Sequence, residues 1–475
     1  MQFIVEYPME NKEEKFSAKR FLKGLLREII VPVALALIVI QYVIQAFQIP
    51  SGSMEDTLHT GDFLLGLKFT YGSPIPFSNQ KFPGYAYPAK GDVVIFRYPG
   101  EPEYPDGNPT RYTHLFNALM FGNLYWDHEP KAGQPHLVHY ADGPKDYIKR
   151  CVATSGDTVA VHKGRLYING VLQDTLPGRG KYTATARTFS PRDERDAFVV
   201  PSVGDTFTVA DMPLEKLWWL RSLVAQENPD ESVELEISLW KDSVEINNYD
   251  FENFRIPVEN DRGLALNELF RRNRMVLQQR LTQGDTISGV MSFAYFKELS
   301  RIGYLPMIDP NIQGGFTRPV SYMAFEGSLL RDLEGNVALL NQAEEDSAGT
   351  VEMVEVDAPQ DGAATVEGVA GDTLDAPAKS KFEIRRRLLL GGKPLETYVV
   401  KTPQFFMMGD NRDNSADSRY WGFVSLRNIR AKAFVIYFSF ENDDEAFALK
   451  NPFTWWRLPF RIRWGRLGKI IHMID

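Results

Sequence analysis

The hydrophobic pattern begins with one long uncharged apolar run, residues 29–47. A helix needs about 20 such residues to cross a bilayer. Four basic residues precede the run, and basic flanks favour the cytoplasmic side: Lys19, Arg20, Lys23 and Arg27. A cleaved secretory signal is the alternative, but the long charged leader and the length of the run argue against it. We therefore predict a retained transmembrane signal anchor over 29–47, with residues 1–28 in the cytoplasm and the rest outside.

Beyond residue 61 the pattern changes to short alternating or wholly apolar runs bounded by Gly, Pro and Asp. Such runs predict strands; they occupy residues 62–66, 92–97, 158–162, 165–169 and 431–440. The pairs Gly156-Asp157 and Asn169-Gly170 are typical of the turns between strands. We predict a mainly β core.

A large excursion, residues 176–390, interrupts the strand pattern. Within it, apolar residues at helical spacing predict a helix over 264–279, and alternation predicts a strand over 234–240. We interpret the excursion as an inserted α+β region that divides the core into residues 48–175 and 391–450. The end of the insertion, residues 344–378, contains no Lys or Arg and is rich in Asp, Glu, Ala and Gly. This composition predicts a flexible stretch.

The tail, residues 451–475, is basic and aromatic within an acidic chain. Aromatic rings favour the membrane–water boundary and basic side chains favour anionic lipid. The tail therefore fits a membrane-surface segment. It fits equally a surface strand packed on the core, and the two interpretations are compatible.

Composition excludes several classes of function. The formal charge of −9 and the pI near 5.5 argue against general nucleic-acid binding. A single cysteine, Cys151, rules out an internal disulfide framework and a cysteine-rich zinc site. His136 and His139 have no carboxylate nearby in a known metal pattern, so we expect no metal ion and no cofactor.

Candidate chemistry lies in three separated segments. Ser51 and Ser53 follow the apolar run, without the Gly-x-Ser-x-Gly pattern of a nucleophile elbow. Lys149 lies in a strand-like run between Ile148 and Arg150, where burial or a neighbouring positive charge would lower its pKa and make it a base. The alternative is a pair of solvated surface charges. The third segment, residues 405–424, is a dense cluster of Gly, Asp, Asn, Arg and Ser after an apolar run.

Together these segments resemble bacterial type I signal peptidases, which are membrane-anchored serine proteases with a Ser/Lys dyad. The matching motifs occur in the family order and span residues 47–54, 57–58, 61–62, 91–96, 147–150, 156–157 and 408–423. The resemblance is firm over residues 47–172 and 395–440, and does not cover the excursion between them. It implies an antiparallel β catalytic core behind one N-terminal transmembrane helix, with the α+β insertion.

The resemblance also implies a role for each matching residue. Ser53 would be the nucleophile and Lys149 its general base, with the Ser51 hydroxyl and the Ser53 N–H forming the oxyanion hole. Three further residues would support this site: Ser415 orients the Lys149 amine, and Asp417 and Arg419 form an ion pair. Ile49 and Ile148 would line shallow pockets for small substrate residues.

The implied function is removal of signal peptides from exported preproteins at the outer face of the cytoplasmic membrane, through an acyl-enzyme. Signal peptides and the lipid bilayer would be the partners, and nucleic acid would not. One departure is Asp56, which stands where the family usually has Pro. Two alternatives remain: another class of Ser/Lys hydrolase, and a catalytically silent signal-peptide-binding protein of the envelope.

Overall fold

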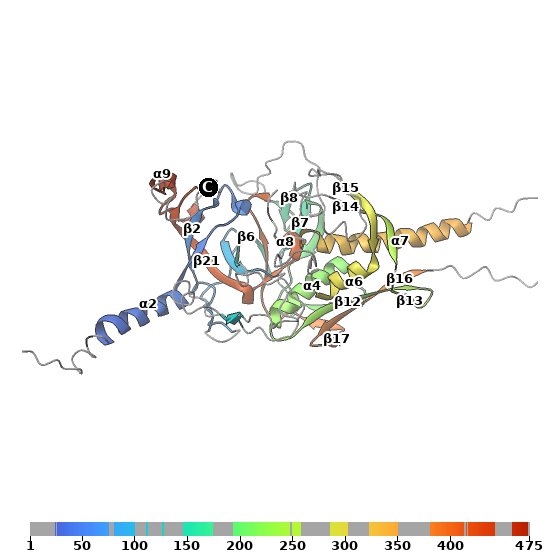
Figure 1. Cartoon of the computed structure of the whole chain (residues 1–475), viewed down its shortest axis with the longest axis horizontal. Coiled ribbons are helices and arrows are strands. Elements are labelled where there is room, and N and C mark those ends of the chain that lie inside the picture. The colour runs from blue at the N-terminus through green and yellow to red at the C-terminus, as the bar shows by residue number, and fades with distance from the viewer. Residues whose placement is uncertain are drawn as a thin grey trace, which may run out of the picture.

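The fold is given by a computed structural model of the chain (Figure 1). It describes residues 24, 26–75, 80–99, 111–112, 126–127, 146–173, 193–247, 249–257, 286–302, 323–349, 381–412, 415, 417–441 and 458–473. Several predicted features lie outside these ranges: the helix over 264–279, the acidic residues 350–378, His136, His139, Trp455 and Trp456.

The largest sheet has seven strands, and every neighbouring pair in it is antiparallel. Across the sheet the order is β1 (Ile44–Gln48), β2 (Asp62–Leu67), β21 (Ile429–Ser439), β3 (Val93–Arg97), β6 (Asp146–Thr154), β19 (Gln404–Met408) and β20 (Val424–Ser425). Branched and aromatic residues dominate these strands, and such residues pack well on a pleated surface. The predicted antiparallel β core is confirmed. Strands from the first and the last parts of the chain lie next to one another in this sheet. Residues more than 250 positions apart in sequence therefore come into contact, as Arg150 and Asp410 do.

A second antiparallel sheet follows directly from β6. Its strands are β7 (Thr158–His162), β8 (Arg165–Ile168), β9 (Val171–Leu172) and β10 (Arg195–Val199), in the order β10-β7-β8-β9. Asn169 and Gly170, between β8 and β9, have φ angles of 52° and 78°. A two-residue hairpin turn of this kind requires positive φ at both positions, which Asn-Gly tolerates best. The predicted turn is therefore confirmed.

The excursion folds as a mixture of helices and strands, as predicted. Its elements are β11 (Thr206–Thr208), α4 (Leu214–Glu227), β12 (Val233–Lys241), β13 (Val244–Ile246), β14 (Asp250–Pro257), β15 (Thr286–Ser292), α6 (Phe293–Ile302), α7 (Met323–Gly349), β16 (Phe382–Leu390), β17 (Lys393–Leu395) and β18 (Thr397–Val399). The predicted strand over 234–240 is confirmed as β12. Three further short elements are β4 (Arg111–Tyr112), β5 (Trp126–Asp127) and α8 (Ser418–Trp421).

Two predicted boundaries of the excursion are wrong. β17 pairs with β16 and β18 pairs with β11, so the excursion's own strands continue past residue 390 and the core resumes at β19. The flexible stretch does not begin at residue 344, because α7 continues to Gly349. Glu and Ala are good helix formers, so a charge-biased segment there can extend an existing helix.

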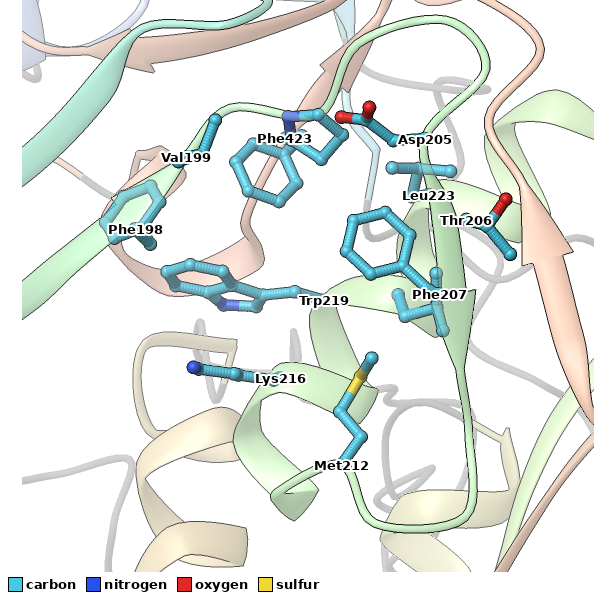
Figure 2. A pocket seen from close by; sticks show the side chains of 12 residues that line it. Phe198, Val199, Asp205, Thr206, Phe207, Met212, Lys216, Trp219, Leu223 and Phe423 are labelled. Atoms are coloured by element: carbon cyan, nitrogen blue, oxygen red, sulfur yellow. The ribbon is translucent and has the colours of Figure 1, made fainter.

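Helix α4 packs the excursion against the core. Trp219 of α4 belongs to the same hydrophobic cluster as Phe406 and Phe423. Its ring centroid lies 5.6 Å from that of Phe423, in an edge-to-face arrangement. A cavity of about 370 Å³ opens at this junction, lined largely by aromatic and aliphatic side chains (Figure 2). The excursion is therefore packed on the strands that carry the candidate site.

The apolar N-terminal run is not one continuous helix. A π-helical turn (Leu26–Ile30) leads into α2 (Val31–Tyr42), which projects from the body of the molecule (Figure 1). The predicted anchor is wrong at its C-terminal end, because residues 44–47 belong to β1 and pair with β2. Among the described residues, no helix is both long enough and apolar enough to cross a membrane.

The tail packs on β21 and also exposes aromatic rings. Its elements are α9 (Leu458–Arg461) and two 3₁₀ turns, Trp464–Arg466 and Ile471–Met473. Single β-bridges join Ile462 to Phe440 and Ile470 to Val435. Phe460 and Trp464 are 85% and 64% exposed. The packed interpretation of the tail is confirmed, and its exposed rings leave the membrane interpretation open as a prediction.

Candidate active site

Ser53 lies in a 3₁₀ turn, Gly52–Met54, within the loop between β1 and β2. Backbone hydrogen bonds close the base of this loop: Ile49 N donates to Asp62 O at 2.8 Å and Gly61 N to Ile49 O at 3.0 Å. Met54, next to Ser53, is fully buried and anchors the turn in the core. Ser53 is therefore fixed by packing on one side and by backbone pairing on the other.

Lys149 approaches Ser53 from β6. Its backbone pairs with Val94 of β3, and its side chain is directed at the turn, with Nζ 2.7 Å from Ser53 Oγ and 2.9 Å from the carbonyl of Ile148. Only 4% of Lys149 is exposed. The interpretation of Lys149 as a solvated surface charge is therefore wrong, and the two residues predicted to react together lie within hydrogen-bonding distance.

The surroundings of Lys149 favour its neutral form. Burial lowers the pKa of the amine from 10.5 to about 8, while the Asp417 and Asp410 carboxylates act in the opposite direction. Of the two alternative causes, burial and the neighbouring charge of Arg150, only burial lowers this pKa. The Arg150 guanidinium forms a buried ion pair with Asp410, which neutralises its charge. Burial is the dominant effect.

Asp417 and Arg419 form the predicted ion pair. Arg419 Nε lies 2.8 Å from Asp417 Oδ1 and Nη2 lies 2.9 Å from Oδ2, and both side chains are fully buried. Asp417 Oδ2 also accepts a hydrogen bond from Gly409 N at 3.1 Å. Burial alone would raise the pKa of Asp417, but the Arg419 charge and the hydrogen bonds from Arg419, Gly409 and Ser415 together hold the pKa below its usual value. Asp417 is therefore an anion behind Lys149.

In the part of the chain that the structure describes, the predicted hydrogen bond between Ser415 and the Lys149 amine is not present. Ser415 Oγ is buried beside the Asp417 carboxylate and helps to lower its pKa, while the partners of Lys149 Nζ among the residues described are Ser53 and the Ile148 carbonyl. Ser415 does lie against the site: a Cβ added to Gly409 would meet Ser415 Oγ at 2.2 Å and Ser53 O at 2.5 Å. A side chain at position 409 would therefore displace both serines.

The remaining predicted residues lie around the same turn. Ser51 Oγ is 3.5 Å from Ser53 Oγ. Ile49 is 2% exposed and belongs to a hydrophobic cluster against which Ile148 packs. The structure thus brings Ser51, Ile49 and Ile148 together beside the Ser53–Lys149 pair.

A second buried ion pair, between Arg150 and Asp410, holds the site together. Asp410 accepts two hydrogen bonds from Arg150, at 2.8 Å and 2.6 Å, and one from Thr57 at 2.6 Å. Next to it, Asn411 donates to the carbonyls of Gly52 through its side chain and Ser53 through its backbone. These contacts join the nucleophile loop, β6 and the segment after β19. All these residues lie in the motifs that carried the resemblance, but only their spatial arrangement reveals the pairing.

Comparison with known proteins shows the family to which these segments belong. The profile of the family described as "Signal peptidase, peptidase S26" matches residues 22–212 and 357–438, which is more than half of the chain. A protein named Signal peptidase I from Pseudomonas aeruginosa is 34% identical over 139 residues, covering 29% of this chain and 34% of that protein. Signal peptidase I of Aquifex aeolicus is 64% identical over 42 residues, covering 9% of this chain and 16% of that protein.

A third relative, Signal peptidase I of Buchnera aphidicola, is 47% identical over 77 residues, which are 16% of this chain and 21% of that protein. The chain thus spans about a third, or less, of the length of these curated relatives. The family match covers the loop that carries Ser53, the strand that carries Lys149 and the segment around Asp417. The chain belongs to the signal peptidase family, peptidase S26.

Proposed function

We propose that this protein is an endopeptidase that removes N-terminal signal peptides from exported preproteins, with Ser53 as nucleophile and Lys149 as general base. One observation carries the proposal: the 2.7 Å contact between Lys149 Nζ and Ser53 Oγ, in a buried setting that lowers the pKa of the amine to about 8. The names of the relatives supply the substrate class.

The reaction follows from this contact. Neutral Lys149 removes the proton of the Ser53 hydroxyl as Oγ attacks the carbonyl carbon of the scissile bond. The resulting ammonium then protonates the leaving amine, which departs with the mature protein and leaves the signal peptide esterified to Ser53. A water molecule, deprotonated by Lys149, hydrolyses the ester and restores the hydroxyl. No metal or cofactor enters this scheme.

The oxyanion formed during attack needs hydrogen-bond donors. We assign the Ser53 N–H and the Ser51 hydroxyl to this role, because both belong to the same short turn as the nucleophile. One such donor is typically worth about 10²- to 10³-fold in rate. Ile49 and Ile148 flank the reacting pair and would select small side chains at the substrate positions before the cleaved bond.

Membrane attachment fits the exposed surface of the N-terminal segment. Apolar side chains exposed there by about half or more are Ile29, Ile30, Val31, Val33, Leu35 and Ile38. Several exposed apolar side chains on one short segment favour lipid over water. We propose that this segment anchors the chain in the cytoplasmic membrane, with residues 1–28 inside and the sheets on the extracytoplasmic side. The exposed rings of the tail would rest on the same membrane surface.

The pKa of Lys149 predicts the pH dependence of cleavage. Because only the neutral amine accepts a proton, kcat/KM should rise about tenfold per pH unit below about pH 8 and level off above it. A lysine with its usual pKa of 10.5 would place this rise more than two units higher. The profile of a soluble peptide substrate between pH 6 and 10 measures the position of the rise; a rise centred near 10.5 would show that burial does not activate Lys149.

The backbone at Asp56 makes another prediction. Its φ is 79°, whereas proline is fixed near −65°, so the residue usual in the family does not fit the loop of this chain. Asp56→Pro should displace the Ser53 turn and lower kcat/KM at least about tenfold. Asp56→Gly, the matched control, tolerates positive φ and should stay within about twofold of wild type. Equal activity of the two variants would contradict this description of the loop.

The function itself is tested by incubating the purified chain with a preprotein in detergent and sequencing any new N-terminus. Release of the mature protein after a small residue supports the proposal. Stable binding of the signal peptide without cleavage would instead indicate a catalytically silent binding protein. Cleavage at unrelated sites would indicate another class of Ser/Lys hydrolase.

A further inference from the structure

Arg419 has more than one acidic partner. Besides its two hydrogen bonds to Asp417, its Nη1 lies 3.2 Å from Asp193 Oδ1, and its Nη2 donates to the Arg412 carbonyl at 2.8 Å. The side chains of Asp193, Asp417 and Arg419 all have zero exposure. Two carboxylates therefore share one buried guanidinium. Burying a third charge is costly unless it serves the arrangement of the other two.

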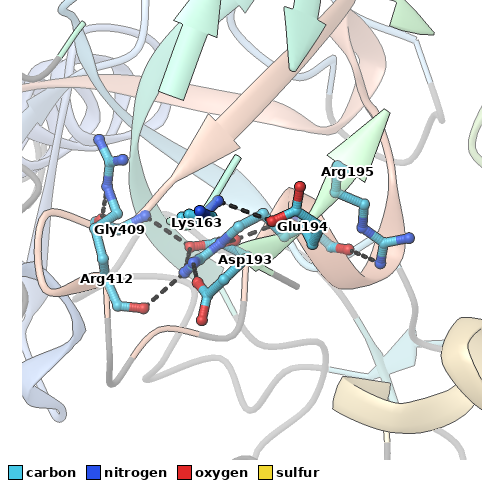
Figure 3. A network of polar contacts seen from close by, with 8 residues as sticks. Lys163, Asp193, Glu194, Arg195, Gly409 and Arg412 are labelled. Carbon is cyan, nitrogen blue, oxygen red and sulfur yellow. Dashed lines mark hydrogen bonds and ion pairs between the residues drawn. The ribbon is translucent and has the colours of Figure 1, made fainter. Parts of the chain in front are cut away.

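Asp193 comes from the excursion, and its backbone is fixed. The N–H of Gly164, in the turn between β7 and β8, donates to Asp193 O at 2.8 Å. Figure 3 shows Asp193 at the centre of this network, with Gly409 and Arg412 on one side and Arg195 on the other. A backbone hydrogen bond from the turn between β7 and β8 thus holds Asp193 in place just before β10.

Two other residues of the excursion, Arg195 and Trp219, bind the backbone of α8, the helix that contains Arg419. Arg195, which pairs with Glu215 of α4, donates to the Arg419 carbonyl at 2.7 Å. Trp219, also of α4, donates to the Tyr420 carbonyl at 3.2 Å. The excursion therefore fixes both the side chain and the backbone of the short helix that follows Asp417.

One member of this network, Asp417, acts on the charge of Lys149. The carboxylates facing the amine are Asp417, from the segment before α8, and Asp410, from the segment after β19. Arg150 is paired with Asp410, and the Tyr147 ring lies 5.5 Å from Lys149 Nζ. Asp417 is the one of these groups that is also bound to Arg419.

We propose that Asp193 is a positioning residue for the general base, acting on Lys149 through Arg419 and Asp417. This inference rests on the proposed function. With Asp193, the buried trio carries a net charge of −1 behind the amine; without its carboxylate the trio is neutral. Removing that charge should therefore favour the neutral amine and, at the same time, loosen the geometry that directs the amine at Ser53.

The test is Asp193→Asn, which keeps an oxygen for Arg419 and removes the charge. The titration of Lys149 is followed through the ¹³C signal of its Cε in the full chain in detergent, assigned by its loss in Lys149→Arg. We expect the midpoint of the Lys149 titration to move to lower pH. The rise of kcat/KM with pH for preprotein cleavage should move with it. The plateau kcat should fall about tenfold while KM changes less than about threefold, because the substrate pockets are untouched.

Glu194→Gln is the matched control. Glu194 is the next residue and also loses one negative charge, but its side chain is 57% exposed and pairs with His162. Solvent screens such a charge, so the Lys149 titration should stay unchanged. An unchanged titration and rate in Asp193→Asn, or an equal effect of Glu194→Gln, would overturn the proposal.

If Asp193→Asn does not fold, Asp193→Glu is measured instead. Glutamate keeps the negative charge but moves the carboxylate. We therefore expect the pKa of Lys149 to stay at its wild-type value and the plateau kcat to fall. A wild-type kcat would overturn the proposal. The Lys149 titration needs no substrate, so a wild-type chain that cleaves no preprotein would refute the proposed function while the titration still decides the role of Asp193.

Discussion

Replacing Lys149 by Ala or by Arg is expected to lower kcat/KM for a preprotein by at least about 10³-fold. Alanine removes the only amine in contact with Ser53 Oγ among the described residues. Arginine keeps a positive charge and most of the length, but a guanidinium stays protonated at any working pH and accepts no proton. The rates of cleavage at pH 9, where wild-type Lys149 is largely neutral, measure both losses.

Lys163→Arg is the matched control for this pair. Lys163 is an exposed lysine in the turn between β7 and β8, so the same chemical change there should leave kcat/KM within about twofold of wild type. Substantial activity of Lys149→Arg would show that proton acceptance by this side chain is not required.

The second large effect concerns stability. Asp410→Ala removes one partner of a buried ion pair: Asp410 is 1% and Arg150 5% exposed at the side chain. Arg150 and Thr57 would both lose their acceptor. Leaving a buried charge without its partner typically costs about 3–5 kcal/mol. We expect the free energy of unfolding to fall by about this amount in urea denaturation followed by tryptophan fluorescence.

An exposed ion pair supplies the comparison. Lys90 Nζ lies 3.0 Å from Asp157 Oδ1, but half of the Lys90 side chain is exposed. Lys90→Ala should therefore change the free energy of unfolding by no more than about 1 kcal/mol. Similar losses in the two variants would mean that the buried Arg150–Asp410 pair contributes no more to the free energy of unfolding than an exposed ion pair.

The sequence was most informative where strands and motifs coincide. Alternating and apolar runs predicted β2, β3 and β21 of the large sheet and β7 and β8 of the second, and Asn169-Gly170 predicted a hairpin turn that the φ angles confirm. The motifs that resembled signal peptidases identified Ser53, Lys149 and the Asp417–Arg419 pair, which the structure brings to one place. Local pattern sufficed there because strand period and turn chemistry are local properties.

The sequence was less informative where long-range contacts decide the structure. Ile44–Gln48 is apolar enough to extend a membrane helix, yet it pairs with β2, and only the presence of that partner makes it a strand. Asp193 gave no signal, because an aspartate in a polar stretch predicts a solvated turn until Arg419 is found beside it. The orientation of the Ser415 hydroxyl likewise depends on packing that sequence does not encode locally.

The most direct test of the central claim is the rate at which Ser53→Ala and wild type remove the leader from one purified preprotein, in the same detergent and at the same pH, with the product N-terminus read by mass spectrometry. The Ser53 hydroxyl is the atom group that our account places in the covalent intermediate. We predict that wild type releases the mature protein by cleavage after a small residue and that Ser53→Ala, folded to the same thermal stability, releases none. Cleavage at the same bond by Ser53→Ala at a rate near that of wild type would contradict the account.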